Sequence, residues 1–348
     1  MQSAFPRLDD RSSGVRPFLD LSARLGRDSG MIQASGGNTS IKEGGRLWIK
    51  ASGKVLAAAR SEEIFVALDL DAVRGAIRDG AEDPVSAHVI GDPGLRPSIE
   101  TSLHALMPHR YVFHVHSVDV LAWAVREDGE EAVSERMKGL RWGWVPYARP
   151  GVPLTRAVAS VAAEKPDFLV LGNHGLVVGG DTCAEIEQRI ETAVGRLRAA
   201  ARPYQAGPKE ILDAWIGSGA FRLPADDRVH ALGRDGDILE MARRGVLYPD
   251  HVVFLGPVLP VADPAADVEV ETARYVERFG NEPPAVVVAG VGVLLAGASR
   301  FGVEEMLLCL VDVLARVAPG TGLRYLADTE IAELLNWDAE KYRRALYR

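Results

Sequence analysis

The chain of 348 residues has few cysteines and no long apolar segment. Its two cysteines, Cys183 and Cys309, stand in unrelated settings, which excludes a disulfide framework and a cysteine-rich zinc site. The longest apolar run, residues 285–298, contains three glycines and is shorter than the ~20 residues that a membrane helix needs. We therefore expect no membrane span and predict a reducing, cytoplasmic location.

An excess of basic charge is also missing. The formal net charge is −8, with both signs mixed along the chain, whereas nucleic-acid binding would need a basic stripe. The N-terminus reaches Asp9-Asp10-Arg11 before any apolar run, so we expect no signal peptide. A small anionic substrate stays compatible with this composition, because a local site can be positive inside an acidic protein.

Two familiar enzyme motifs are absent. No His-Glu-x-x-His occurs, so nothing indicates a zinc protease. Gly290-Val291-Gly292 lacks the third glycine and the helix of a dinucleotide-binding fingerprint. We predict instead that these glycines bend a buried hairpin.

Helices and strands are expected in mixed order. Helical spacing predicts a first helix around Phe18, Leu21 and Leu25, and Thr182 with Glu185 forms a capping box for a later one. Other helices are expected at 71–78, 98–106, 118–125, 155–164 and 304–317, and strands at 38–42, 46–50, 63–68, 111–116, 167–171, 176–178, 252–255 and 285–295. Without strict βαβ alternation, this order favours an α/β sandwich over a doubly wound fold.

The composition shifts after Ala201, where prolines and glycines gather and indicate a boundary near residues 203–225. We predict one domain at 1–205 and a second, smaller α/β domain at 225–348. The second domain has no assignable role from its sequence. Its Asp250 and His251 are expected in a surface turn, with an approach to a substrate as the alternative.

Three histidines suggest a metal site. His114 and His116 lie in an expected buried strand, where side chains two residues apart share one face and can converge on one ion. Two half-buried, hydrogen-bonded histidines are the alternative. His174 occupies a tight Asn-His-Gly turn between two apolar runs, where loops often carry function. It is either a solvated turn tip or the third imidazole of a catalytic site.

Glu100 lies at an expected helix start. A carboxylate there can simply partner the helix dipole, but beside a metal it would be a ligand, a general base, or both in turn. His104 shares a helix face with Glu100, and we interpret it as a packing or supporting residue.

Four segments occur together in a distinctive order: Gly37-Asn38-Thr39-Ser40 followed by Ala51-Ser52-Gly53, then Pro97-Ser98-Ile99-Glu100, His114-Val115-His116 and Gly172-Asn173-His174-Gly175. In this order and spacing they resemble the class II aldolase/adducin family, which includes fuculose- and rhamnulose-phosphate aldolases. The resemblance covers about residues 15 to 200. It implies a three-layer α/β/α sandwich around a mostly antiparallel sheet.

The resemblance also implies a site. Metal ligands carry over onto His114, His116 and His174, and the acid/base carboxylate onto Glu100, with one divalent ion per chain. We expect Zn²⁺, with Mn²⁺ or another ion as the alternative. Tyr147 resembles a catalytic tyrosine that reaches a neighbouring subunit's site; an interface or packing tyrosine is the alternative.

The family's phosphate pocket would map to Asn38, Ser40, Ser52, Gly53 and Ser98. Small hydroxyls and backbone N–H groups suit phosphate oxygens. One position departs from the family pattern: several of these aldolases carry a second serine just before the glutamate, and Ile99 stands there in this chain. This departure weakens the phosphate assignment relative to the metal assignment.

The implied function is that of a metal-dependent lyase in carbohydrate metabolism. It would cleave a ketose phosphate or related sugar by retro-aldol chemistry through a metal-stabilised enediolate. Glu100 would move the proton on the carbon next to the carbonyl. Tyr147 or water would move the proton on the oxygen that departs with the aldehyde. By resemblance the protein would be a homo-oligomer, commonly a tetramer.

Other activities fit the same resemblance. A methylthioribulose-phosphate-type dehydratase also uses a glutamate, whereas the pentose-phosphate 4-epimerases carry an aspartate near that position, so Glu100 argues mildly against an epimerase. A non-catalytic adducin-like assembly domain is the alternative of another class. The three histidines and Glu100 weigh against it, and nothing specific indicates a metal-dependent hydrolase.

Overall fold

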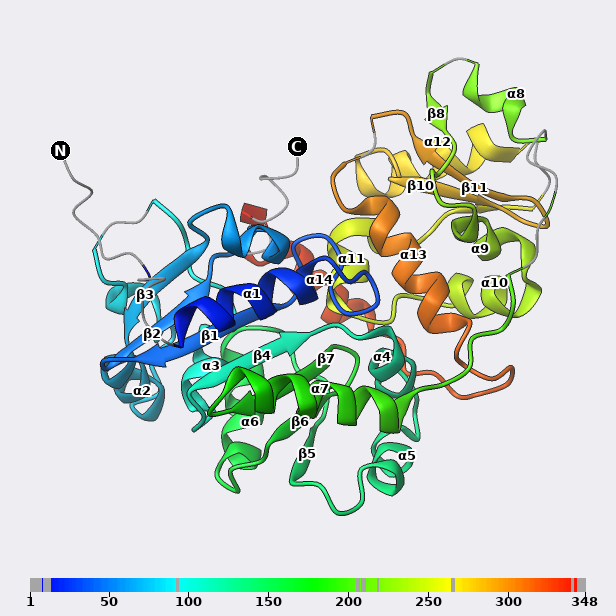
Figure 1. The fold of residues 1–348 in the computed structure, drawn as a ribbon. Helices are drawn as coiled ribbons and strands as arrows, with labels where there is room; N and C mark the ends of the chain where they lie inside the picture. Colours follow the sequence, from blue (N-terminus) through cyan, green and yellow to red (C-terminus); the bar gives the residue numbers. More distant parts are fainter. Residues whose placement is uncertain are drawn as a thin grey trace. The chain divides into compact units, whose positions relative to one another are not determined.

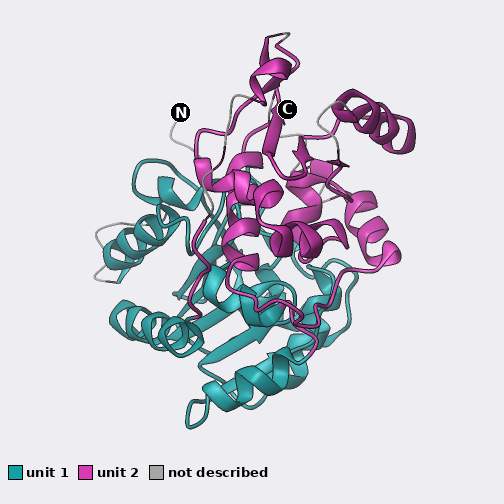
Figure 2. Ribbon diagram, turned by 90° about the vertical axis from the view of Figure 1, so that its right-hand side faces the viewer, with its two compact units in different colours: residues 1–124, 128–198 teal, residues 125–127, 199–348 magenta. Residues whose placement is uncertain are grey.

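The computed structural model describes Leu8 and residues 14–91, 94–204, 207, 211–217, 219–263, 267–298, 300–338 and 341–342. The segment on which the signal-peptide expectation rests, and part of the predicted boundary at 203–225, lie outside these residues. The chain divides into two compact units, residues 1–124 with 128–198, and residues 125–127 with 199–348 (Figures 1 and 2). The predicted domain boundaries stay a prediction.

Unit 1 is built on a seven-stranded sheet in the order β3-β2-β1-β4-β7-β6-β5. Its strands are β1 (Asn38–Glu43), β2 (Arg46–Lys50), β3 (Phe65–Asp69), β4 (Tyr111–Val115), β5 (Trp142–Val145), β6 (Phe168–Leu171) and β7 (Gly175–Gly180). Only β5 and β6 pair in parallel; the other neighbouring pairs are antiparallel. The expected mostly antiparallel sheet is confirmed.

Helices cover both faces of this sheet, as Figure 1 shows. Phe113 of β4 faces α1, where its ring lies 5.7 Å from that of Phe18. Its neighbour Val112 points to the opposite face and packs with residues of α3 and α6, as the two-residue period of a strand requires. The helices of unit 1 are α1 (Val15–Gly26), α2 (Leu70–Arg78), α3 (Thr101–Leu106), α4 (Val118–Ala124), α5 (Gly129–Arg136), α6 (Val152–Ala162) and α7 (Cys183–Leu197), with 3-10 turns η1 (Leu56–Arg60) and η2 (Ser86–His88).

The local signals in unit 1 produced the expected elements. Phe18, Leu21 and Leu25 are buried along α1, and Thr182 caps α7 by accepting a hydrogen bond from the Glu185 amide. The turn between β1 and β2 needs two residues in the left-handed region, which Gly44 and Gly45 supply. Together the layers form the expected three-layer sandwich.

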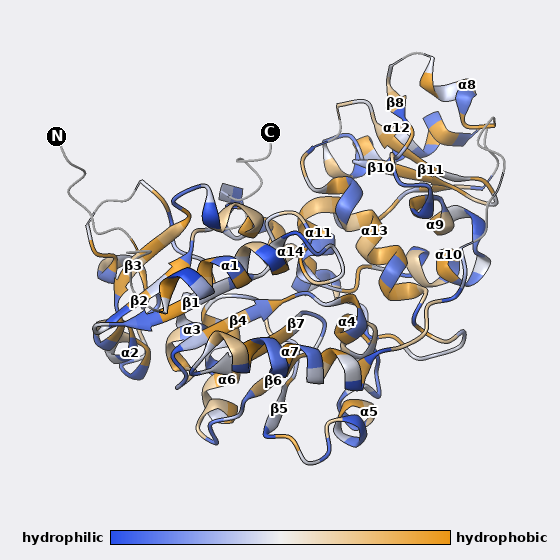
Figure 3. Ribbon diagram, in the orientation of Figure 1, coloured by the Kyte–Doolittle hydropathy of each residue, from blue (hydrophilic) through white to orange (hydrophobic). Residues whose placement is uncertain are grey.

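Unit 2 contains a four-stranded sheet in the order β8-β11-β10-β9. Its strands are β8 (Phe221–Arg222), β9 (Val261–Ala262), β10 (Ala285–Val288) and β11 (Gly292–Ala296), and its helices are α8 (Asp213–Ile216), η3 (Asp227–His230), α9 (Ala231–Arg234), α10 (Gly236–Arg243), α11 (Pro249–Leu255), α12 (Val268–Phe279), α13 (Val303–Leu314) and α14 (Asp328–Asn336). The glycine-bent hairpin is confirmed as β10–β11. Figure 3 shows that β11 and α13 carry much of the hydrophobic sequence of this unit, and the second α/β part is confirmed.

Two expectations in unit 2 are wrong. Residues 252–255 form the end of helix α11 and not a strand, because Pro249 occupies the first turn, where its fixed φ suits a helix. A four-residue apolar run has no periodicity that could separate the two structures. Asp250 and His251 are buried on this helix, at 4% and 1% exposure, and do not form a surface turn.

The described part of the chain contains no helix with both the length and the apolar character needed to cross a bilayer.

Candidate metal centre

Three segments of unit 1 bring the predicted histidines together. His114 lies on β4, in the middle of the sheet, and His116 follows just beyond its end. His174 belongs to the turn between β6 and β7, where Asn173 adopts a left-handed φ of 54°, a conformation that asparagine tolerates better than most residues. Gly175 lets this turn approach β4, because a Cβ there would lie 2.6 Å from the Val115 carbonyl oxygen.

The three imidazoles are buried and face one another. Their ring centroids are 4.8, 4.9 and 5.5 Å apart, and one ligand atom from each lies within 4.8 Å of the others. The Nε2 atoms of His114 and His116 are separated by 3.0 Å. His114 Nδ1 donates to the carbonyl oxygen of Leu176 at 3.1 Å, so the Nε2 of the neutral ring carries a lone pair.

Glu100 completes this cluster from the start of α3. Its Oε1 lies 3.1 Å from His174 Nε2 and its Oε2 lies 3.5 Å from His114 Nε2. Asn38 on β1, which is the register partner of His114 on β4, donates from Nδ2 to Glu100 Oε2 at 2.7 Å. The amide of Asn38 therefore holds the carboxylate against the imidazoles.

The pKa values of His114 and Glu100 are shifted by burial and by the neighbouring side chains of the cluster. Burial lowers the pKa of His114 to about 3, against the opposing effect of Glu100. Burial alone would raise the pKa of Glu100, but His114, His174 and Asn38 hold it well below its ordinary value. At neutral pH the site therefore combines a neutral His114 imidazole with an ionised carboxylate.

This arrangement fits a divalent cation. The lone pair of His114 Nε2 faces Glu100 Oε2, so two electron-pair donors lie close together in a buried space and repel each other. A cation bound between them would turn this repulsion into attraction. Ligand nitrogens about 2.0 Å from a tetrahedral zinc lie about 3.3 Å apart, close to the 3.0 Å between the Nε2 atoms of His114 and His116. A buried triad that could hold a divalent metal is thus present, and Glu100 lies beside it.

His104 lies apart from the metal cluster and bonds to Ser40. Ser40 Oγ lies 2.8 Å from His104 Nδ1, and both side chains are fully buried. Burial lowers the pKa of His104 well below its ordinary value, which keeps the ring neutral. The Ser40 hydroxyl is therefore bonded to His104, and its phosphate role stays a prediction.

The other predicted phosphate residues gather beside Glu100. Ala51 forms an isolated bridge with Pro97, and Ser52 N donates to the Arg96 carbonyl oxygen at 2.8 Å. Ser98 Oγ accepts from the Glu100 amide at 3.3 Å, and Gly53 has a left-handed φ of 76°. Ser52, Gly53 and Ser98 are therefore brought together, while their binding role stays a prediction.

Tyr147 lies just beyond β5. Its backbone runs next to Gly172, since a Cβ placed on that glycine would lie 3.2 Å from Tyr147 N. This puts the segment beside the turn that carries His174, but the catalytic role of the tyrosine stays a prediction.

Sequence reasoning missed two contacts of this centre. It did not connect the Asn38 amide with Glu100 or Ser40 with His104, and the phosphate role of Asn38 stays a prediction. Both contacts depend on how β1 pairs with β4 and lies against α3. No local spacing in the sequence carries that information.

The comparisons agree with this fold and site. The profile of the Class II Aldolase and Adducin N-terminal domain matches residues 18–200. The chain therefore belongs to the class II aldolase/adducin family.

Three relatives illustrate the range of the family. The chain is 33% identical to the Uncharacterized oxidoreductase YuxG of Bacillus subtilis over 274 residues, which is 72% of this chain but 39% of that protein. It is 28% identical to the Methylthioribulose-1-phosphate dehydratase of Leptospira biflexa, over 49% of this chain and 88% of that enzyme. It is 23% identical to the L-fuculose phosphate aldolase of Methanocaldococcus jannaschii, over 51% of this chain and 89% of that enzyme.

Proposed function

We propose that this protein is a divalent-metal-dependent lyase that cleaves a ketose phosphate or related sugar by retro-aldol chemistry. The observation that carries the proposal is the convergence of His114, His116 and His174 with the ionised Glu100 in one buried cluster. The relationship to a fuculose phosphate aldolase supports it. We place the reaction in carbohydrate metabolism in the cytoplasm.

The three histidines would hold the metal, and we propose Zn²⁺, with Mn²⁺ as the alternative. A bound divalent ion would act as a Lewis acid that lowers the energy of an enediolate formed from the substrate. Three neutral imidazoles suit this role, because they leave the positive charge of the ion uncompensated.

Glu100 would move the proton at the carbon beside the substrate carbonyl. Its pKa lies below the ordinary value, so the carboxylate is ionised at neutral pH. It can take the proton from that carbon in the condensation direction, and the protonated acid returns it to the enediolate carbon in cleavage. The amide of Asn38 orients the carboxylate. In cleavage, Tyr147 or a water molecule would take the proton from the hydroxyl group that becomes the departing aldehyde oxygen.

The substrate phosphate would bind at Ser52, Gly53 and Ser98. These residues lie beside the backbone that leads into Glu100, and their hydroxyl and N–H groups suit phosphate oxygens. We further propose a homo-oligomer, with a tetramer as the arrangement implied by the family.

Metal analysis tests the central claim. Wild type, His116→Ala and the control His88→Ala, which removes an imidazole outside the triad, are purified without chelator and analysed for divalent metals. We expect about one ion per chain in wild type and control, and a loss in His116→Ala. A wild type that holds no metal and takes up neither zinc nor manganese would refute the lyase and favour an adducin-like assembly role.

The reaction itself is then assayed with ketose 1-phosphates such as fuculose 1-phosphate. Release of dihydroxyacetone phosphate, abolished by Glu100→Gln while the metal is retained, would support the aldolase. If the metal is present but no C–C bond is cleaved, the aldolase proposal fails.

A dehydratase is the second candidate, favoured by the 28% identity to the Leptospira biflexa enzyme. Glu100 would serve it equally well, because removal of water begins with abstraction of a proton from a carbon beside a carbonyl, and a carboxylate can take that proton. Incubation with methylthioribulose 1-phosphate separates the two. A dehydratase loses water and keeps the carbon skeleton, whereas an aldolase yields two fragments.

A further inference from the structure

A pocket of about 640 Å³ lies within unit 2, whereas the residues of the metal centre belong to unit 1. Its walls come from four parts of the unit: the end of α11 with the turn after it, the end of α12 with the loop 281–284, α14, and the four residues Ala296, Ala298, Arg300 and Phe301. The volume is within the roughly 300–1,000 Å³ range of small-molecule sites. All of its lining residues belong to the same unit.

Most of the lining residues carry aromatic or otherwise apolar side chains. Phe254, Tyr275, Phe279 and Phe301 contribute rings, and Phe301 is 43% exposed. Planar rings bind other rings well by offset or edge-on packing. These walls therefore favour a ligand with a flat apolar body.

Parts of the wall are rigid. Pro257, Pro283 and Pro284 restrict the backbone around the pocket. The Tyr275 hydroxyl packs closely against the backbone at Gly256, where a Cβ would lie within 2.4 Å of the oxygen and φ is +88°. A wall fixed in this way loses little conformational entropy on binding.

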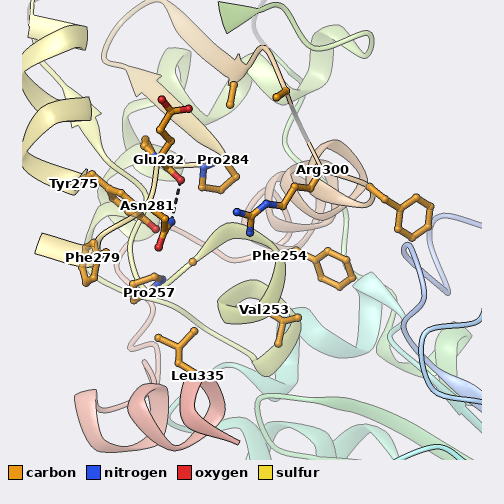
Figure 4. A pocket seen from close by; sticks show the side chains of 15 residues that line it. Val253, Phe254, Pro257, Tyr275, Phe279, Asn281, Glu282, Pro284, Arg300 and Leu335 are labelled. Atoms are coloured by element: carbon orange, nitrogen blue, oxygen red, sulfur yellow. Dashed lines mark hydrogen bonds between the residues drawn. The ribbon is translucent and has the colours of Figure 1, made fainter. Parts of the chain in front are cut away.

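One cation reaches into the pocket. Figure 4 shows the Arg300 guanidinium extending into the space between Phe254, Pro257 and Asn281, while the Glu282 carboxylate points away from it. In the part of the chain that the structure describes, no side chain pairs with this guanidinium. Asn281 Nδ2 donates to the Glu282 carbonyl oxygen at 3.0 Å, which anchors the amide at the pocket wall.

We propose that this pocket binds a small aromatic carboxylate, with its ring against the aromatic walls and its carboxylate on Arg300. A guanidinium binds a carboxylate in a planar, two-bond geometry that a neutral group cannot reproduce. The site is independent of the lyase chemistry and needs no metal.

Calorimetric titration of the full chain tests this, with indole-3-propionate as the probe and its neutral carboxamide as the matched ligand. We expect saturable one-to-one binding of the acid and at least tenfold weaker binding of the amide, because the neutral amide cannot form the two charge-assisted hydrogen bonds with the guanidinium. Arg300→Gln should weaken acid binding at least tenfold and leave amide binding unchanged.

Two further variants control for charge and shape. Arg243→Gln removes an exposed arginine that pairs with Asp263 outside the pocket, and it should bind the acid as wild type does. Ala298→Trp should fill the pocket and abolish binding of both ligands. Circular dichroism and metal content should be unchanged in every variant.

Each contrary result overturns the proposal. These results are no saturable binding of the acid up to its solubility limit, equal affinity for acid and amide, or undiminished acid binding in folded Arg300→Gln or Ala298→Trp. None of them affects the lyase, whose metal and cleavage assays are separate.

Discussion

Replacing Ser40 by alanine separates a structural role from a substrate-binding one. The resemblance places Ser40 in a phosphate pocket, whereas the structure buries its hydroxyl completely against His104 at 2.8 Å. Among the described residues, His104 Nε2 has no hydrogen-bond partner. Ser40→Ala would therefore leave the whole imidazole unsatisfied in the interior.

The expected cost follows from this geometry. Leaving a buried polar group without its partner destabilises a protein by about 1–3 kcal/mol. For a unit of this size each kcal/mol lowers the melting temperature by about 2–4 °C. We expect Ser40→Ala to melt several degrees below wild type, with the Michaelis constant for a phosphorylated substrate little changed.

A double-mutant cycle measured by thermal and denaturant unfolding makes the test specific. In Ser40→Ala/His104→Leu both polar partners are gone, so the loss should be clearly smaller than the sum of the single losses. Ser52→Ala is the matched control, since this serine is less buried and should affect the Michaelis constant more than the stability. Unchanged melting of Ser40→Ala, together with a raised Michaelis constant, would refute our reasoning and restore the phosphate role.

Two other predictions concern packing and pH. Gly175→Ala should lower the metal content, because its Cβ would lie 2.6 Å from the Val115 carbonyl oxygen and separate the turn from β4. The control is Gly195→Ala at an exposed position of α7 with open space around it. It should keep the metal and raise the free energy of unfolding by about 0.5–1 kcal/mol. A metal-replete Gly175→Ala would contradict this. Burial lowers the pKa of His251 to about 3, so below its unfolded value of about 6.5 only the unfolded state binds the proton, and stability should fall by about 1.4 kcal/mol per pH unit. The free energy of unfolding, measured with urea between pH 7.5 and 5, should depend less steeply on pH in His251→Gln than in wild type. An identical pH dependence would show that His251 does not cause the loss of stability.

Local patterns determined much of unit 1. The helical spacing of Phe18, Leu21 and Leu25 and the cap at Thr182 depend on neighbours three or four residues away, so they can be recognised in the sequence. The face shared by His114 and His116 follows from the two-residue period of a strand. These are short-range rules, and the structure confirms the elements built on them.

Short apolar segments were harder to assign. Residues 252–255 have the composition of a strand, yet they form the end of α11 because the chain enters a helix at Pro249. Tertiary packing decides between the two structures in runs of this length. The same packing buries Asp250 and His251. Their burial could not be predicted from the sequence, in which they are simply two polar residues after a proline.

The sequence by itself determined which residues could hold a metal and that they belong to an α/β sandwich. Only the tertiary structure decided that Asn38 holds Glu100, that Ser40 serves His104 and that Arg300 reaches into a pocket among aromatic rings. The physical reason is the range of the interactions. Alternation and capping act between near neighbours, whereas strand pairing and the closing of a pocket join residues far apart in the chain.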